Sequence, residues 1–133
     1  SLSAFLEARG EGDTLAGWLG AVRPDRGART IQDHRLWPYF ALRFGLAIVD
    51  TLEPKPGIAP TTRHLSAVVD RARTQGADLI LASPYFDPRH ARFVAERTGA
   101  RVAEMAHQVG SRPGTDHYLA MVDYNVRQIV GSP

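Results

Sequence analysis

The chain has 133 residues, a length that suits one domain with a buried core, and no linker or repeat divides it. Hydrophobic residues make up 44% of the sequence and charged residues 23%, and no apolar run approaches the length of a membrane span. The net charge of +2 comes from scattered residues rather than a basic block, which argues against a nucleic-acid partner.

The sequence contains no cysteine, which excludes disulfides and thiolate zinc sites. Any metal must therefore be held by His, Asp or Glu. Every basic residue except Lys55 is arginine, and we attribute this bias to a GC-rich genome because no Gly-rich phosphate loop accompanies it. No basic and apolar leader follows Ser1, so we expect no signal peptide within these residues.

Apolar residues at helical spacing predict a bent or two-part helix over 2–19, interrupted by Gly10 and Gly12. After it, short apolar runs typical of strands alternate with amphipathic segments typical of helices. We expect strands at 29–32, 47–51, 78–82 and 101–105, and helices at 36–44, 62–74, 88–98 and 115–129. This alternation predicts an α/β fold, a three-layer α/β/α sandwich with a four-stranded, mostly parallel sheet.

Residues with capping chemistry support these helix limits. The expected caps are Thr61 or Thr62, Asp87 before Pro88, Gly99, and Thr115 or Asp116. Because the carboxyl ends of parallel strands meet at one edge of a sheet, the loops that follow the strands define the candidate site. These loops are 33–34, 53–60, 83–87 and 107–114.

Several motifs follow one another in a recognisable order. Residues 33–46 place a histidine before a Tyr-Phe pair and an aromatic-Gly-Leu sequence, and a proline-rich stretch follows at 53–60. Further matches are 83–87, 96–100 and the pair Tyr118 and Asn125. With these motifs the chain resembles, over residues 3–130, the C-terminal lobe of zinc/manganese ABC-transporter substrate-binding proteins of the ZnuA type.

The resemblance implies that residues 1–27 are the end of an interlobe helix with its connection, and that 28–133 form the C-terminal lobe. It also implies a receptor without enzymatic activity, which captures Zn²⁺ in preference to Mn²⁺ and delivers it to an ABC permease. Such receptors work outside the cytoplasm, in the periplasm or at the cell surface, as lipoproteins or secreted proteins. Their metal lies between two lobes, so we expect an incomplete site here, to be completed by the N-terminal lobe.

Two histidines are the candidate metal ligands. The resemblance implies that His34 is one of them, whereas spacing alone favours a helix cap or a bond to a backbone carbonyl. His107 lines up with a stretch in which related proteins often have an aspartate. A histidine there would make the site richer in nitrogen and favour Zn²⁺ over Mn²⁺. The alternative is that His107 is a surface residue in a mobile loop.

Other polar residues near this edge receive structural interpretations. Asp33 is a candidate outer partner that steers an imidazole, whereas we expect Glu53 to order its own loop. Asp87 is explained by helix capping. We expect His64 and His90 to face solvent within helices.

The remaining candidates lie on the aromatic-rich and final helices. His117 is a distant third candidate for the metal. Asn125 is expected to tie a buried backbone group. Core packing explains a set of mostly aromatic side chains, namely Trp37, Tyr39, Phe40, Phe44, Tyr118, Met121 and Val122.

Two other functions remain open from the sequence. One is a small metal-dependent hydrolase with His34 and His107 as ligands and Asp33 or Glu53 as base, although no third ligand or nucleophile motif is evident. The other is a metal-independent interaction or structural domain, because this type of fold serves many functions. The first strand-to-helix loop lacks the Gly-x-Gly-x-x-Gly pattern of nucleotide binding.

Overall fold

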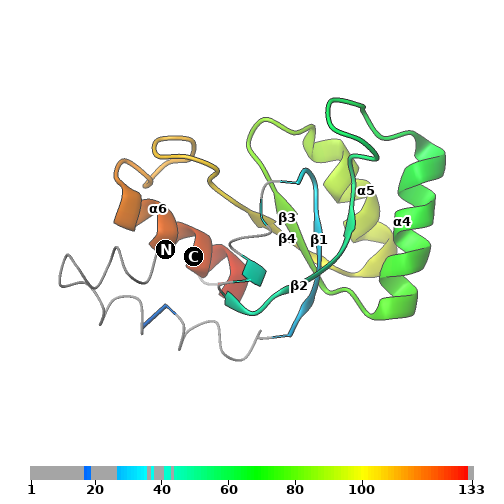
Figure 1. Cartoon of the computed structure of the whole chain (residues 1–133), viewed down its shortest axis with the longest axis horizontal. Coiled ribbons are helices and arrows are strands. Elements are labelled where there is room, and N and C mark those ends of the chain that lie inside the picture. The colour runs from blue at the N-terminus through cyan, green and yellow to red at the C-terminus, as the bar shows by residue number, and fades with distance from the viewer. Residues whose placement is uncertain (1–16, 19–26, 36, 38–40, 43, 132–133) are drawn as a thin grey trace.

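A computed structural model describes residues 17–18, 27–35, 37, 41–42 and 44–131 (Figure 1). Gly17 and Trp18 are helical, and the rest of the helix expected over 2–19 lies outside the described residues. The same holds for most of the expected segment 36–44, of which Ala41, Leu42 and Phe44 are helical. The expected boundary between residues 1–27 and 28–133 is therefore untested.

The described strands are β1 (Arg29–Gln32), β2 (Ala47–Thr51), β3 (Leu79–Ala82) and β4 (Arg101–Glu104). They form a four-stranded sheet in the order β2-β1-β3-β4, and every neighbouring pair is parallel. The chain crosses from the β2 edge back to β3, so the strand order reverses between β1 and β3. Ligands of such sheets bind at this reversal, beyond the carboxyl ends of the strands.

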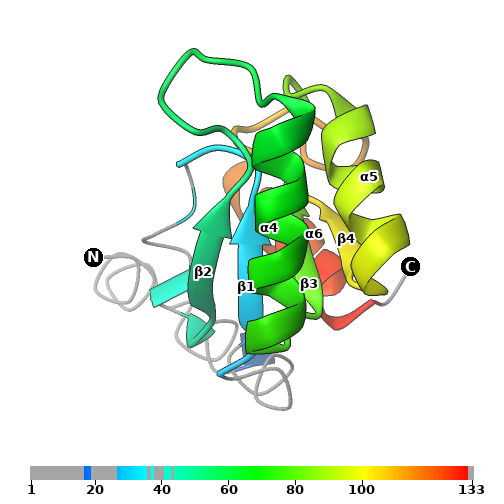
Figure 2. The same cartoon turned by 90° about the vertical axis from the view of Figure 1, so that its right-hand side faces the viewer.

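Helices cover both faces of the sheet, as the three-layer prediction requires. α4 (Thr62–Gln75) and α5 (Pro88–Thr98) lie on one face, and α6 (Tyr118–Val130) lies on the other (Figure 2). No described helix combines the length and the apolar character needed to cross a membrane.

Side-chain alternation along β3 divides the core into two layers. Ile80 packs with Val68 of α4 and Val94 of α5, while Leu79 and Leu81 pack against the α6 side with Ile129. This period of two follows from the pleat of a strand, and it explains why β3 is buried at all four positions. The two layers hold the sheet, and with it the loops at its carboxyl edge.

Most of the expected caps are confirmed. The Thr61 hydroxyl accepts a hydrogen bond from His64 N–H, Asp87 accepts one from Arg89 N–H, and Gly99 ends α5 in the left-handed conformation at φ 75°. The expected start of the last helix is wrong, because α6 begins three residues after Thr115.

His117 is the cap of α6, and its Nδ1 accepts a hydrogen bond of 3.1 Å from Ala120 N–H. Thr115 is fully buried instead, and its hydroxyl donates to the Arg112 carbonyl at 2.6 Å. Tyr118 is 40% exposed, so the expectation that core packing explains it is also wrong. Trp37, Phe44 and Val122 are buried as expected.

The register between β1 and β2 contains a bulge. Arg29 and Thr30 pair with Ala47 and Ile48, which lie 18 residues further along, whereas Ile31 pairs with Asp50, 19 residues further. One extra residue in β2 therefore lies between the two halves of the ladder. Beyond the strands the shifted register continues, because Glu53 N–H donates to the Asp33 carbonyl at 3.0 Å.

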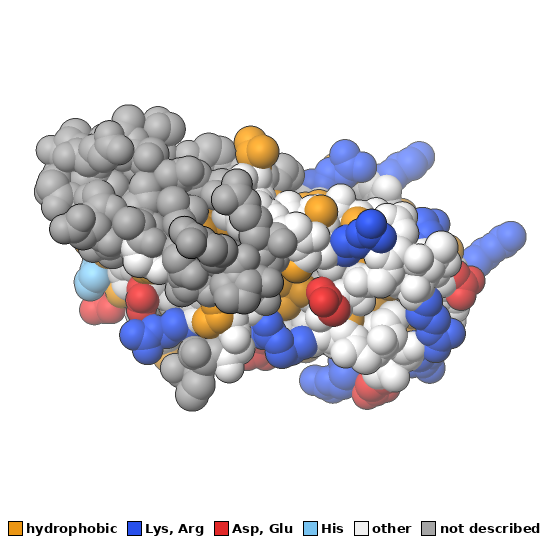
Figure 3. All heavy atoms as spheres, turned by 90° about the horizontal axis from the view of Figure 1, so that it is seen from below, with side chains coloured by type: hydrophobic (Ala, Val, Ile, Leu, Met, Phe, Trp, Pro, Cys, Tyr) orange, Lys and Arg blue, Asp and Glu red, His pale blue; other side chains and the backbone are white. Residues whose placement is uncertain are grey.

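Arginines close the carboxyl ends of the helices at the amino edge of the sheet. Figure 3 views the molecule from below and shows basic side chains in blue on that face. Arg29 donates to the Gln75 carbonyl at the end of α4 at 2.6 Å, and Arg73 to the Arg97 carbonyl of α5 at 2.9 Å. Arg101 donates to the last turn of α6, at Gln128 O (2.6 Å) and Ile129 O. The last carbonyls of a helix lack partners within it and attract cations, so these arginines stabilise the fold.

Candidate metal site

The loops that follow the four strands lie together at the top of the molecule in Figure 1. They carry His34 after β1, Glu53 after β2, Tyr85 after β3 and His107 after β4. Because the strands are parallel and buried, these side chains reach one edge from positions that are far apart in the sequence.

Glu53 holds the imidazole of His34. His34 Nδ1 and Glu53 Oε1 are 2.8 Å apart, and the two side chains are 28% and 10% exposed. The expectation that Glu53 orders its own loop is therefore incomplete, because its side chain contacts the candidate ligand. The imidazole is partly open to solvent while its carboxylate partner is nearly covered.

The carboxylate of Asp33, a candidate partner of the imidazole from the sequence, bonds to backbone and serine groups instead. Its Oδ1 accepts hydrogen bonds from His34 N–H at 2.7 Å and from Ser83 Oγ at 2.9 Å, and its Oδ2 accepts one from Ser83 N–H. The side chain thus joins the ends of β1 and β3, where the strand order reverses. Burial raises the pKa of Asp33, and the hydrogen bonds from Ser83 act in the opposite direction.

Tyr85 lies against both histidines. Its ring centroid is 5.9 Å from that of His34 and 5.0 Å from that of His107, and both contacts are edge-on, with interplanar angles of 74° and 75°. The Tyr85 side chain is 54% exposed. Partial burial raises the pKa of its phenol, and the nearby charges of Asp33 and Glu53 add to this effect.

His107 carries a nitrogen without a partner. Its Nδ1 is buried and makes no hydrogen bond, while the residue as a whole is half-buried beside Tyr85. An unpaired buried nitrogen costs free energy unless another group satisfies it, and metal coordination is one way to do so. The unpartnered Nδ1 is compatible with a ligand role for His107, which stays a prediction beside the alternative of a surface histidine in a mobile loop.

The backbone before His107 is fixed by α6. Asn125 accepts a hydrogen bond from Ala106 N–H at 2.7 Å and donates one to Ala106 O at 2.9 Å. The guanidinium of Arg112 also donates to the Met105 carbonyl at 3.1 Å. The expectation that Asn125 ties a buried backbone group is confirmed, and this tie sets where the His107 loop starts.

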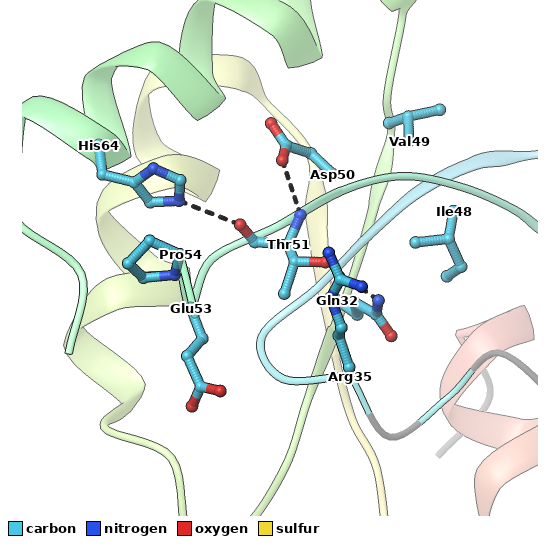
Figure 4. Close-up of a pocket in the computed structure, with 9 residues that line it drawn as sticks. All are labelled: Gln32, Arg35, Ile48, Val49, Asp50, Thr51, Glu53, Pro54 and His64. Carbon is cyan, nitrogen blue, oxygen red and sulfur yellow. Dashed lines mark hydrogen bonds between the residues drawn. The ribbon is translucent and has the colours of Figure 1, made fainter. Parts of the chain in front are cut away.

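The other histidines have partners of their own. His64 Nε2 lies 3.2 Å from the Thr51 carbonyl, so His64 does not simply face solvent. It lines a hollow of about 380 Å³ with Arg35 and Glu53, beside the β2 edge (Figure 4). The His90 ring lies edge-on to the Phe86 ring, with 5.7 Å between the two ring centroids. His117 caps α6 and is thereby explained without a metal.

Two imidazoles and no thiolate suit Zn²⁺, which binds histidine nitrogen at about 2.0–2.1 Å, usually with four ligands. Among the described residues no group of three or more His, Asp or Glu side chains is arranged to hold a metal ion. His34 and His107 are brought to one edge and to one aromatic ring, and Asp33 is directed elsewhere. Reasoning from the sequence missed the contact of Glu53 with His34, and the signal for it is the strand register.

The fold matches one lobe of solved metal-binding proteins of the substrate-binding class. The model of the family described as "ZnuA: Zinc-uptake complex component A periplasmic" matches residues 16–132. The chain therefore belongs to the ZnuA family, and its resemblance to this family is confirmed.

Curated relatives are consistent with this assignment. The high-affinity zinc uptake system protein ZnuA of Brucella abortus is 26% identical over 80 residues, which are 60% of this chain and 24% of that protein. The corresponding protein of Brucella suis gives the same values. The chain thus aligns with only part of the length of these relatives.

Solved structures show the same fold. A ZnuA crystal structure has a TM-score of 0.66 and 21% identity, with 98% of this chain and 48% of that chain covered. The laminin-binding protein Lmb of Streptococcus agalactiae has a TM-score of 0.70 and 22% identity, covering 92% and 47%. FpvC of Pseudomonas aeruginosa, solved with Mn²⁺, has a TM-score of 0.68 and 18% identity, covering 93% and 48%. This chain therefore corresponds to about half of each, which is one lobe.

Proposed function

We propose that this chain is the C-terminal lobe of a receptor that captures Zn²⁺ outside the cytoplasm and hands it to an ABC permease. The observation that carries the proposal is the meeting of His34 and His107, from the β1 and β4 loops, on the single ring of Tyr85. Membership of the ZnuA family supports the assignment to zinc uptake. The proposal involves binding and release without a chemical step.

His34 and His107 are the ligands that we assign to the metal. Imidazole nitrogen is a better ligand for Zn²⁺ than for the harder Mn²⁺, so a lobe that offers two histidines favours zinc. Related folds have been solved with Mn²⁺, Ni²⁺ and Cd²⁺, so the metal must be chosen by the ligands rather than by the fold. Two nitrogens leave a tetrahedral ion open, and a second lobe would supply the remaining ligands.

A titration of the chain with Zn²⁺ and with Mn²⁺ by calorimetry tests the assignment. We expect weak binding of Zn²⁺ and weaker binding of Mn²⁺. The substitutions His34→Ala and His107→Ala should each abolish the measurable heat of Zn²⁺ binding. The matched control is His90→Ala, because His90 packs on Phe86 away from both candidate ligands. Its affinity should equal that of the unaltered chain.

Two results would contradict the proposal. One is Zn²⁺ binding that neither His34→Ala nor His107→Ala weakens, which would place the metal elsewhere. The other is an unaltered chain that binds no Zn²⁺ at millimolar concentration, because the proposed pair of ligands should bind at least that weakly.

A further inference from the structure

The side chains of His34 and Glu53 form a close polar contact at the carboxyl edge. The nitrogen and oxygen are 2.8 Å apart, and the carboxylate is 10% exposed, so water competes little for this bond. The edge of the Tyr85 ring contacts the imidazole as well. The ring of His34 is thus held before any metal arrives.

The β-bulge brings Glu53 to this position. Before the bulge each residue of β1 pairs with one 18 positions further along, and after it with one 19 positions further. Glu53 is 19 positions after His34, and the backbone bond from Glu53 N–H to Asp33 O extends the shifted register to the loop. Without the extra residue, Leu52 rather than Glu53 would be level with His34.

The chemistry of this contact decides which nitrogen of His34 is available. An ionised carboxylate only accepts hydrogen bonds, so Nδ1 must carry the proton that lies between the two groups. In the neutral imidazole the lone pair is then on Nε2. A histidine whose other nitrogen donates to a carboxylate is oriented for metal binding and is a more basic ligand.

We propose that Glu53 is a positioning residue for metal capture, which fixes His34 in the Nδ1–H tautomer so that the metal binds Nε2. This inference rests on the proposed function of His34 as a ligand. Glu53 acts through His34 and does not itself bind the metal. The role that the sequence suggested for Asp33 therefore belongs to Glu53, because the hydrogen bonds recorded to the Asp33 carboxylate come from backbone or serine groups.

The tautomer can be measured without metal, by long-range ¹H–¹⁵N NMR of the chain with ¹⁵N-labelled histidine rings. We expect His34 to carry its proton on Nδ1 in the unaltered chain. In Glu53→Ala the proton should move largely to Nε2, whereas Glu53→Gln should keep it on Nδ1, since the amide oxygen still accepts. The control Glu104→Ala removes an exposed carboxylate at the end of β4 and should leave the His34 signals unchanged.

Zn²⁺ titration of the same variants tests the consequence for binding. We expect Glu53→Ala to weaken binding about 10- to 100-fold, as loss of a ligand's carboxylate partner typically does, and Glu53→Gln to weaken it less. On a His34→Ala background, adding Glu53→Ala should cause no further loss, because the two residues act together. If Zn²⁺ binding to His34→Ala is too weak to measure, the tautomer of His34 alone tests the positioning role of Glu53.

Two results would overturn the positioning role. One is an unaltered chain with the His34 proton on Nε2, and the other is a Glu53→Ala variant that keeps it on Nδ1. Neither result depends on whether His34 binds metal. Conversely, Zn²⁺ binding that survives His34→Ala would contradict the proposed function even if the tautomer is as expected.

Discussion

The two edges of the sheet use their charged and polar residues differently. At the amino edge, Arg29, Arg73 and Arg101 donate to the last carbonyls of three helices, so the fold itself uses their charge. At the carboxyl edge, His107 has a buried nitrogen without a partner and Tyr85 is half exposed. Among the described residues, these arginines at the amino edge are therefore used by the helix ends, whereas the carboxyl edge keeps a histidine nitrogen without a partner.

This difference separates stability from function. Substitutions at the amino edge should lower the free energy of unfolding and leave metal affinity alone. Substitutions that remove a metal ligand should lower metal affinity and leave the free energy of unfolding unchanged. Substitutions of residues that support the carboxyl-edge loops should lower both the free energy of unfolding and the metal affinity. The largest loss of stability is expected at such a residue, Asn125.

Asn125→Ala should destabilise the chain by about 2–4 kcal/mol, because it leaves two buried backbone groups of Ala106 without partners. Urea denaturation measures this loss. Zn²⁺ affinity should fall as well, since Ala106 fixes the start of the His107 loop. Asn125→Asp keeps the acceptor for Ala106 N–H but places a carboxylate oxygen against the Ala106 carbonyl in a buried site, so it should lose at least as much stability. A change below about 0.5 kcal/mol in Asn125→Ala would show that α6 does not hold this loop.

Arg101→Met should cost about 1 kcal/mol, because the two hydrogen bonds to the end of α6 are lost while the apolar stem is kept. The control is Arg127→Met, which removes an exposed i,i+4 pair with Asp123 and a basic side chain in the last turn of α6, without a hydrogen bond to the last carbonyls, and should cost about a few tenths of a kcal/mol. Zn²⁺ affinity should be unchanged in both. Equal losses in the two variants, or a weaker metal affinity in Arg101→Met, would remove the distinction between the edges.

Asp87→Asn should have the smallest effect, and one that depends on pH. The hydrogen bond from the Arg89 side chain lowers the pKa of Asp87 from 3.8 to about 2. A carboxyl group with a lowered pKa stabilises the fold above its unfolded value, and the benefit disappears as the pH falls through its folded value. The melting temperature of the unaltered chain should therefore exceed that of Asp87→Asn above pH 3.8, and the two should converge near pH 2.

A difference in melting temperature that stays constant between pH 2 and 6 would contradict this account of Asp87. The Zn²⁺ affinity of Asp87→Asn, measured near neutral pH, tests the comparison of the two edges further. Asp87 lies at the carboxyl edge but caps α5, so Asp87→Asn should bind Zn²⁺ as the unaltered chain does.

Much of the fold was predictable because local chemistry and burial agree. β1, β2 and α5 have the predicted limits, since apolar runs, Asp87 before Pro88 and the left-handed Gly99 all mark the same boundaries. The start of α6 was not predictable from cap preference. Thr115 has the favoured hydroxyl, but burial and its bonds to Arg112 use it elsewhere, and His117 takes the role of cap.

The candidate site was predictable only in part. The strand order of α/β folds places His34 and His107 at one edge, but pairing Glu53 with His34 requires the register of β1 and β2. That register depends on a bulge, and no residue type in β2 predicts it. The arginines were likewise attributed to genome composition, because their helix-end partners come from 24 to 46 residues away in the sequence.

One carboxylate links the loops after β1 and β3. Asp33 receives the backbone N–H groups of both His34 and Ser83, so neither loop opens without breaking a bond to the same side chain. The amide hydrogens of these two residues should therefore exchange with solvent through a single cooperative opening, with matching free energies of opening. A displacement of His34 would then also displace the loop after β3, which carries Tyr85.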